Sequence, residues 1–191
     1  HNEFRITEDY QVLELYGPAK SGTVQVEPGV GAGVVSEDWA KKQSKTNGQR
    51  LQGWNKQTPV FTYAKGREFG PGLRGGSLYA DLGLAEATGG QFHGEIVKTN
   101  SDVHTDQGTT GMHRHEYDLQ FNYLLSGEIE FVIEGINDAP GDEKLIFRQG
   151  DFYCLSSRIL HNETRVSEDY SGMHVYGPAK ASTEQLTPEI D

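Results

Sequence analysis

Short segments in which hydrophobic and polar residues alternate follow one another from about residue 77 onward. In GEIEFVIEG, Ile129, Phe131 and Ile133 alternate with two glutamates and a valine, as in a strand with one buried and one wet face. Similar segments are SLYADLG, GQFHGEIVKT, LQFNYLLSG, KLIFRQG, DFYCLSS and MHVYGPA. They recur at spacings of about 8 to 15 residues and are separated by turn-forming residues. This pattern predicts an all-β antiparallel sandwich or barrel over residues 77–185.

The preceding segment, residues 21–76, has a different texture. Its first forty residues are rich in Gly, Ser, Lys and Gln and show little sustained periodicity. We predict an extended N-terminal arm with little regular structure. One short helix is expected near SEDWAKKQ, where Ser36 suits the N-cap and Glu37 and Asp38 suit the first turn.

The chain contains an internal repeat. HNEFRITEDYQVLELYGPAK at residues 1–20 matches HNETRVSEDYSGMHVYGPAK at residues 161–180 in most positions. We expect residues 1–20 to be a strand-like tail of a preceding copy of the domain, so that this chain is the second half of a two-domain protein. The alternative is a local duplication that serves as a pairing strand. Such a strand would pair where its twin sits, which predicts a homodimer with strand exchange.

Composition and charge exclude several kinds of partner. The chain of 191 residues has 17 basic and 28 acidic residues and a formal net charge of −11, with no run of Lys and Arg to follow a phosphate backbone. We therefore expect no nucleic-acid partner. No apolar segment reaches the roughly 18 residues of a membrane span, so we expect no membrane partner. Cys154 is the single cysteine and is expected to be buried; it favours a reducing, cytoplasmic location, although a processed secreted chain would look the same.

Histidines in GMHRHEYDLQFNYLLSG are the first candidates for chemistry. On a strand, His113 and His115 point the same way, into the barrel if Arg114 points out. His161 lies near the start of a later strand. Three imidazoles converging in a barrel mouth would bind one divalent transition metal, which could be Fe, Mn, Co, Ni, Cu or Zn. A histidine pair on a strand is also common without a metal, so the case for metal binding depends on the spacing of the surrounding motif.

The wider spacing resembles the two signature motifs of the cupin superfamily. The residues that carry the resemblance are Gly111, His113, His115, Gln120, Gly127, Gly150 and His161. The segment from Asp81 to Thr99 also resembles the lead-in of small bacterial cupins that carry glutamine in place of the usual glutamate. The resemblance covers about residues 77–180 and implies a double-stranded β-helix, or jelly-roll barrel. It also implies metal ligation by His113, His115, Gln120 and His161, and the repeat then suggests the C-terminal half of a bicupin.

The sequence departs from the family pattern at four positions. Gln120 stands where the family has glutamate, Ser156 where it has proline, Arg158 where it has glycine and Arg165 where it has asparagine. A neutral amide at position 120 leaves a bound dication fully charged, which favours anionic substrates that bind through two oxygens. Alternatively, Gln120 only hydrogen-bonds a water or a ligand histidine.

Two further side chains are candidates for catalysis. Tyr117 follows His115 by two residues and could offer a phenol to a substrate, although a tyrosine lining a barrel also serves as packing. Glu163 follows His161 by two residues and could act as a base or could orient a ligand. The same His-Asn-Glu triplet begins the repeat at His1, which is equally consistent with a structural role.

Together these features predict a metal-dependent cupin enzyme that acts on a small organic anion, such as an enolate, a phenolic acid or a hydroxy acid. The leading reaction is that of a dioxygenase with iron, similar to quercetinase-type cupins. The alternatives are a metal-dependent lyase or isomerase, and a non-catalytic domain that binds a small ligand. No organic cofactor is expected.

Overall fold

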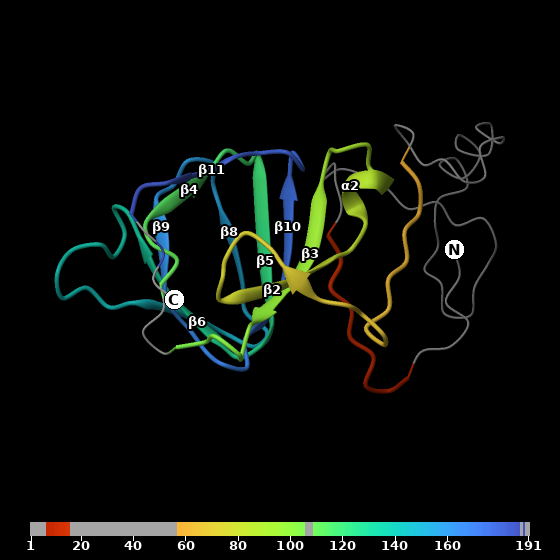
Figure 1. Cartoon of the computed structure of the whole chain (residues 1–191), viewed down its shortest axis with the longest axis horizontal. Coiled ribbons are helices and arrows are strands. Elements are labelled where there is room, and N and C mark those ends of the chain that lie inside the picture. The colour runs from red at the N-terminus through yellow and green to blue at the C-terminus, as the bar shows by residue number, and fades with distance from the viewer. Residues whose placement is uncertain (1–6, 16–56, 106–108, 188, 190–191) are drawn as a thin grey trace, which may run out of the picture. The chain divides into compact units, whose positions relative to one another are not determined.

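The protein is described by a computed structural model that covers residues 7–15, 57–105, 109–187 and 189. The chain divides into two compact units, residues 1–50 and 51–191. The second unit contains every strand of the described residues (Figure 1). The helix predicted near Ser36 falls outside the described residues.

Two antiparallel sheets make up the second unit. The six-stranded sheet has the order β1-β2-β3-β10-β5-β8. Its strands are β1 (Gly70–Pro71), β2 (Ser77–Asp81), β3 (His93–Thr99), β10 (Ser171–Gly177), β5 (Leu119–Ser126) and β8 (Phe152–Leu155). The five-stranded sheet has the order β11-β4-β9-β6-β7. Its strands are β11 (Thr183–Gln185), β4 (His113–His115), β9 (His161–Val166), β6 (Glu128–Ile133) and β7 (Leu145–Arg148).

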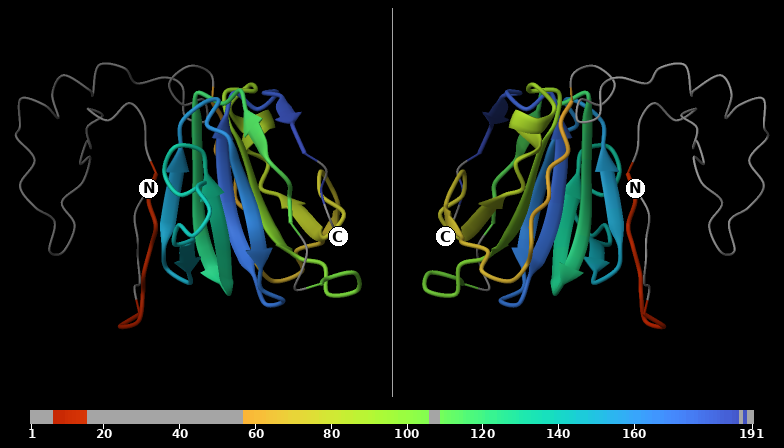
Figure 2. Two further views of the ribbon diagram at one scale, coloured as in Figure 1. Left: turned by 90° about the vertical axis from the view of Figure 1, so that its left-hand side faces the viewer. Right: turned by 90° about the vertical axis from the view of Figure 1, so that its right-hand side faces the viewer.

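The sheets pack face to face around one core. Residues from both sheets share a single buried cluster: Val97, Leu124, Ile129, Phe131, Ile133, Tyr153, Leu155 and Tyr170. Phe131 lies at its centre with 0% of its surface exposed, and its ring meets the ring of Tyr153 edge-on at 4.8 Å. The two views in Figure 2 show the sheets curving around this core. The predicted all-β jelly-roll class is confirmed.

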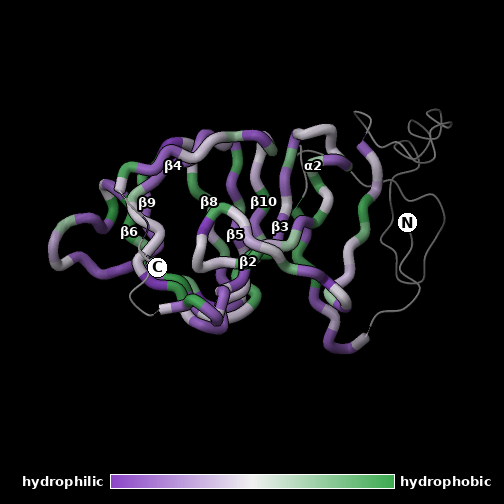
Figure 3. Tube along the Cα trace, in the orientation of Figure 1, coloured by the Kyte–Doolittle hydropathy of each residue, from purple (hydrophilic) through white to green (hydrophobic). Residues whose placement is uncertain are grey.

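Alternation along the strands explains which faces are buried. In β6 every second residue is buried, as GEIEFVIEG predicts. In Figure 3, hydrophobic and hydrophilic residues are interspersed along the strands. On β8 the alternation turns Tyr153 and Leu155 inward and leaves Cys154 exposed. The expectation that Cys154 is buried was therefore wrong, because the tyrosine and leucine on either side occupy the inner face.

A single glycine connects β5 to β6. Gly127 has a φ of +71°, a left-handed conformation that residues with a Cβ rarely adopt. A Cβ at this position would also lie 2.4 Å from Oγ of Ser167 and 2.7 Å from the backbone of Tyr170. The glycine of the first motif is thus required by its own turn and by the turn between β9 and β10 that packs against it.

Two short features were not anticipated. A four-residue helix, α2 (Leu84–Ala87), precedes β3, and no periodicity in so short a segment could have predicted it. Strand β1 lies within the segment that was predicted to be an arm. Among the described residues, no helix is long and apolar enough to cross a membrane.

The repeated sequence forms the same turn in both copies. In the second copy the amide of Tyr170 donates to the carbonyl of Ser167, at 3.1 Å, between β9 and β10. In the first copy, within residues 7–15, the amide of Tyr10 donates to the carbonyl of Thr7 at the same distance. The likeness of the two segments therefore extends from the sequence to their local conformation.

Candidate metal centre and cavity

Three histidines from adjacent strands of the five-stranded sheet come together. His113 and His115 lie two residues apart on β4, so both side chains leave the same face of the strand. His161 on β9 is the direct cross-strand partner of His113. One ring nitrogen from each of the three lies within 4.8 Å of the others, and all three residues are buried. This spacing is suitable for a single metal ion among three imidazoles.

Hydrogen bonds fix the orientation of the rings. Nδ1 of His113 donates to the carbonyl of Gly111 at 2.8 Å, and Nδ1 of His161 donates to the carbonyl of Ile159 at 2.9 Å. Because a carbonyl can only accept, both rings carry a proton on Nδ1, which leaves Nε2 as the nitrogen that can face a metal. Nδ1 of His115 lies 2.8 Å from the hydroxyl of Thr183 on β11. A metal ligand is held in this way by a hydrogen bond from its second nitrogen.

The free nitrogens have the protonation state that a metal needs. Burial lowers the pKa of His113, and it lowers the pKa of His115 to about 3, so both rings are neutral at pH 7. Nε2 of His161 is buried and has no hydrogen-bond partner among the described residues. A buried acceptor without a partner is costly, and a metal ion would satisfy it. The residues therefore fit a divalent transition metal.

Glu163 lies beside this cluster. Its Oε2 is 3.7 Å from Nε2 of His113, and the same oxygen accepts a hydrogen bond from the hydroxyl of Thr110. Burial acts to raise the pKa of Glu163, but the imidazoles of His113 and His161 and the Thr110 hydrogen bond outweigh it and hold the pKa below its usual range. Glu163 is therefore an anion at neutral pH. Its predicted role as a base or as an orienting group remains a prediction.

Gln120 reaches the same cavity from the opposite sheet. It lies on β5, where its cross-strand neighbour is Tyr176 of β10, and Tyr176 in turn pairs with His93 of β3. Gln120 lines the cavity together with the three histidines. Its predicted place as a fourth metal ligand, or alternatively as a hydrogen-bonding neighbour, remains a prediction.

The cavity above the histidines has a volume of about 360 Å³ and is rich in tyrosine. Tyr117 stacks on the ring of His115 at 4.7 Å and on that of Tyr176 at 4.4 Å. The five tyrosines of the lining are Tyr79, Tyr117, Tyr153, Tyr170 and Tyr176. Burial raises the pKa of Tyr117, so its phenol keeps its proton at neutral pH. The volume and the aromatic walls suit a small, flat organic ligand.

Four charged residues or histidines of the lining were missed by the sequence analysis: Arg74, His93, Glu95 and His174. His93 and Glu95 lie two residues apart on β3 and face the cavity, with Nε2 of His93 3.1 Å from Oε2 of Glu95. The alternation that singled out His113 and His115 could have found this pair. Arg74 enters from the loop between β1 and β2, within the predicted arm, where no sequence signal indicated a site.

The turn before β9 contains a left-handed residue that is not the glycine of the family pattern. Arg158, which stands where the family has glycine, has a φ of +65°. Its amide donates to the carbonyl of His115 at 2.9 Å, and its side chain donates to the carboxylate of Glu116. The conformation is thus kept without glycine, since these hydrogen bonds hold the arginine in place.

Taken together, a two-sheet β-barrel encloses a cluster of three buried histidines. Comparison with solved structures gives the polyketide cyclase RemF from Streptomyces resistomycificus, with a TM-score of 0.52 and 11% identity over 68% of this chain and 87% of that one. KdgF from Halomonas sp. has a TM-score of 0.46 and 19% identity, covering 62% of this chain and 94% of that one. An RmlC-like cupin from Shewanella frigidimarina NCIMB 400 has a TM-score of 0.46 and 16% identity, covering 65% and 95%.

These neighbours are cupin-type proteins, and the chain has the cupin fold. No protein-family model matches the sequence, and no curated protein matches it. The resemblance found in the two motifs is confirmed for the fold. Its three-histidine cluster could hold a metal ion.

Proposed function

We propose that the protein is a metal-dependent enzyme that acts on a small organic anion, with a dioxygenase-type oxidation as its leading reaction. The observation that carries the proposal is the cluster of His113, His115 and His161, whose ligand nitrogens lie within 4.8 Å of one another at a cavity of about 360 Å³. Imidazole ligands carry no negative charge, so a dication bound by them can attract an anionic substrate. Iron is the metal we favour, with Mn, Co, Ni, Cu and Zn as the other candidates.

The metal would supply Lewis acidity and, if it is iron, one-electron chemistry with dioxygen. The chain itself supplies the surroundings of the substrate. The stacked rings of Tyr117 and Tyr176 form one aromatic wall, against which a flat substrate would be held. Glu163 is ionised and close to His113, so it is placed to accept a hydrogen bond from a substrate hydroxyl as the substrate binds.

A lyase or isomerase is the second candidate, and the pair His93 and Glu95 favours it. The carboxylate of Glu95 lies 3.1 Å from the His93 ring, and the pair faces the cavity from the sheet opposite the histidine cluster. An imidazole held by a carboxylate can take a proton from one atom of a substrate and return it to another. Redox-neutral reactions need such a transfer, whereas a non-catalytic binding domain does not.

The first experiment is elemental analysis of protein purified without chelator, followed by assays on a panel of enolic and phenolic acids. Oxygen uptake is measured in air, and substrate loss is measured both in air and without oxygen. Near-stoichiometric iron with oxygen-dependent turnover is expected. Turnover that continues without oxygen would replace the dioxygenase by the lyase or isomerase. Stoichiometric metal with no turnover of any acid would favour the third alternative, a non-catalytic domain that binds a small ligand.

A further inference from the structure

Arg74 is a buried cation at the edge of the cavity. Its side chain is only 11% exposed, although it lies in a loop. The loop is fixed at this residue, since the amide of Arg74 donates to the hydroxyl of Tyr79 at 3.1 Å and the amide of Ser77 donates to the carbonyl of Arg74. Arginine is rarely buried unless its charge is paired, so its surroundings need an explanation.

One side of the guanidinium is tied to the strand that carries the histidines. Nη1 of Arg74 donates to Oε1 of Gln185 at 2.7 Å. Gln185 pairs with His113 across β11 and β4, and its amide nitrogen donates to the carbonyl of Thr110 at 2.8 Å. The arginine is therefore held in a fixed position relative to the metal-binding strand.

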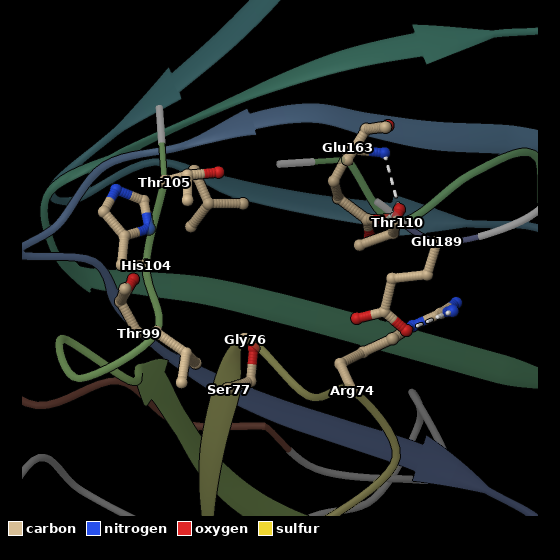
Figure 4. A pocket seen from close by; sticks show the side chains of 12 residues that line it. Arg74, Gly76, Ser77, Thr99, His104, Thr105, Thr110, Glu163 and Glu189 are labelled. Carbon is tan, nitrogen blue, oxygen red and sulfur yellow. Dashed lines mark hydrogen bonds and ion pairs between the residues drawn. The ribbon is translucent and has the colours of Figure 1, made fainter. Parts of the chain in front are cut away.

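The other side of the guanidinium has no partner. Nη2 of Arg74 is buried and makes no hydrogen bond to any of the residues that the structure describes. The carboxylate of Glu189 contacts Nη1 instead, and its Oε2 lies 3.5 Å away, a long contact for an ion pair. Figure 4 shows Arg74 and Glu189 side by side in the smaller hollow that Thr110 and Glu163 also line. A buried charged donor without an acceptor is costly, and a ligand oxygen would remove this cost.

The charges around the cavity favour an anion. Its lining contains two carboxylates, Glu95 and Glu163, and one arginine, Arg74. A dication bound by the three histidines, together with Arg74, would exceed the two carboxylates by one positive charge. In a chain whose formal net charge is −11, this cavity would be a local exception that attracts anions.

We propose that Arg74 is the substrate-binding residue that selects carboxylic acids: its Nη2 donates to the substrate carboxylate while an enolic or phenolic oxygen of the same molecule faces the histidine cluster. This inference deepens the proposed function and rests on it for the position of the reacting oxygen. The binding of the carboxylate itself depends on the guanidinium alone. The ligand is thus a small, flat hydroxy acid in which both groups are carried by one conjugated unit.

The test compares two probes that differ only in charge at one group. Salicylate carries a carboxylate beside a phenol, and salicylamide carries a neutral amide in its place. Binding of each is measured by titration calorimetry to the wild-type protein, to Arg74→Gln and to Arg74→Lys, with the Mn²⁺-loaded protein and after chelator treatment. Arg148→Gln is the control because it removes an exposed arginine, 62% of whose side-chain surface is accessible, on β7. Metal content and thermal unfolding are recorded for every variant.

We expect Arg74→Gln to weaken salicylate by about 10- to 100-fold, as the loss of a hydrogen bond between charged groups implies. The affinity for salicylamide and the metal content should not change in Arg74→Gln. Arg74→Lys should lose less of the affinity for salicylate, and Arg148→Gln should bind both probes as the wild type does. Equal losses for both probes, an unchanged salicylate affinity in Arg74→Gln, or no saturable binding of salicylate to the wild type would overturn the inference. An Arg74-dependent preference for salicylate in a protein that binds no metal would uphold it and refute the proposed metal-dependent function.

Discussion

Oε2 of Glu163 lies 3.7 Å from Nε2 of His113, the ring nitrogen that the hydrogen bond to Gly111 leaves without a proton. The carboxylate thus sits on the side of the ring where a metal would bind. Thr110 holds it there through its hydroxyl. The position allows Glu163 to neutralise part of the charge of a bound cation, as a direct ligand or through an intervening water.

Replacing Glu163 by glutamine should therefore weaken the binding of a dication by about 10- to 100-fold, the usual effect of losing a group that supports a metal ligand. The amide has the same shape and can still accept from Thr110, so the fold should be retained. Metal affinity is measured by competition with a chelator of known affinity. Glu184→Gln, an exposed carboxylate that pairs with Arg114, is the matched control and should have no effect. An unchanged affinity in Glu163→Gln would place this carboxylate outside the metal's influence.

The histidine cluster makes a stricter prediction. Alanine at His113 or at His161 should reduce the metal content to background, because two imidazoles hold a divalent transition metal much less well than three. The control is His93→Ala, a histidine of the opposite wall that is not part of the cluster. Elemental analysis measures the metal content of the three variants. Stoichiometric metal in both cluster variants would rule out the assigned ligands.

Gln120→Glu tests the residue that departs from the family pattern. A carboxylate at this position would add a negative charge facing the cavity, so we expect a dication to bind at least about tenfold more tightly, equivalent to about 1.4 kcal/mol. Competition with a chelator again gives the affinity. Asp118→Asn, in the connection before β5, gives the background effect of a charge change near this strand. If Gln120→Glu binds no more tightly than the wild type, residue 120 is not a direct ligand.

Gly127 and Gly135 form a pair that separates backbone strain from steric overlap. Both have a positive φ, +71° and +75°, but only at Gly127 would a Cβ meet other atoms. Gly135→Ala should lower the free energy of unfolding by about 1 kcal/mol, the cost of the left-handed conformation. Gly127→Ala should lower it by roughly 2 kcal/mol more, because the backbone of Tyr170 must move. Urea unfolding of both variants measures the difference, and equal losses would refute the packing argument.

The pair His93 and Glu95 predicts a dependence of stability on pH. The hydrogen bond to Glu95 raises the pKa of His93 above its ordinary value of 6.5. The folded protein then holds this proton more tightly than the unfolded chain, so the contribution to stability is full below pH 6.5 and is lost as the pH rises through the raised pKa. The free energy of unfolding should exceed that of Glu95→Gln at pH 6, and the excess should shrink by pH 9. An excess that grows with pH would contradict the pairing.

The local pattern of the sequence was sufficient for the strands and for part of the metal centre. A period of two residues marks β6, and it also places His113 and His115 on one face of β4. These features depend only on neighbouring residues. His161 was reached through the spacing of the second family motif, and the structure brings it opposite His113.

The rest of the cavity depends on contacts between distant parts of the chain. Strand β10 pairs with both β3 and β5, which brings His93, Tyr176 and Gln120 into one row across the sheet. Nothing in the sequence near His93 indicates this row. Arg74 is harder still to predict, because its position depends on Gln185, more than a hundred residues further along the chain. Contacts between residues so far apart leave no periodic pattern in the sequence from which they could be predicted.

The two sheets supply different parts of the site. All three candidate ligand histidines lie on strands of the five-stranded sheet, whereas His93, Glu95, Tyr153 and the other side chains that face them across the cavity lie mainly on the six-stranded sheet. Apart from Gln120, residues of the six-stranded sheet can therefore change which molecule fits without removing a candidate metal ligand. A barrel organised in this way can acquire new substrates through substitutions on one wall, which makes it a suitable starting point for laboratory evolution of specificity.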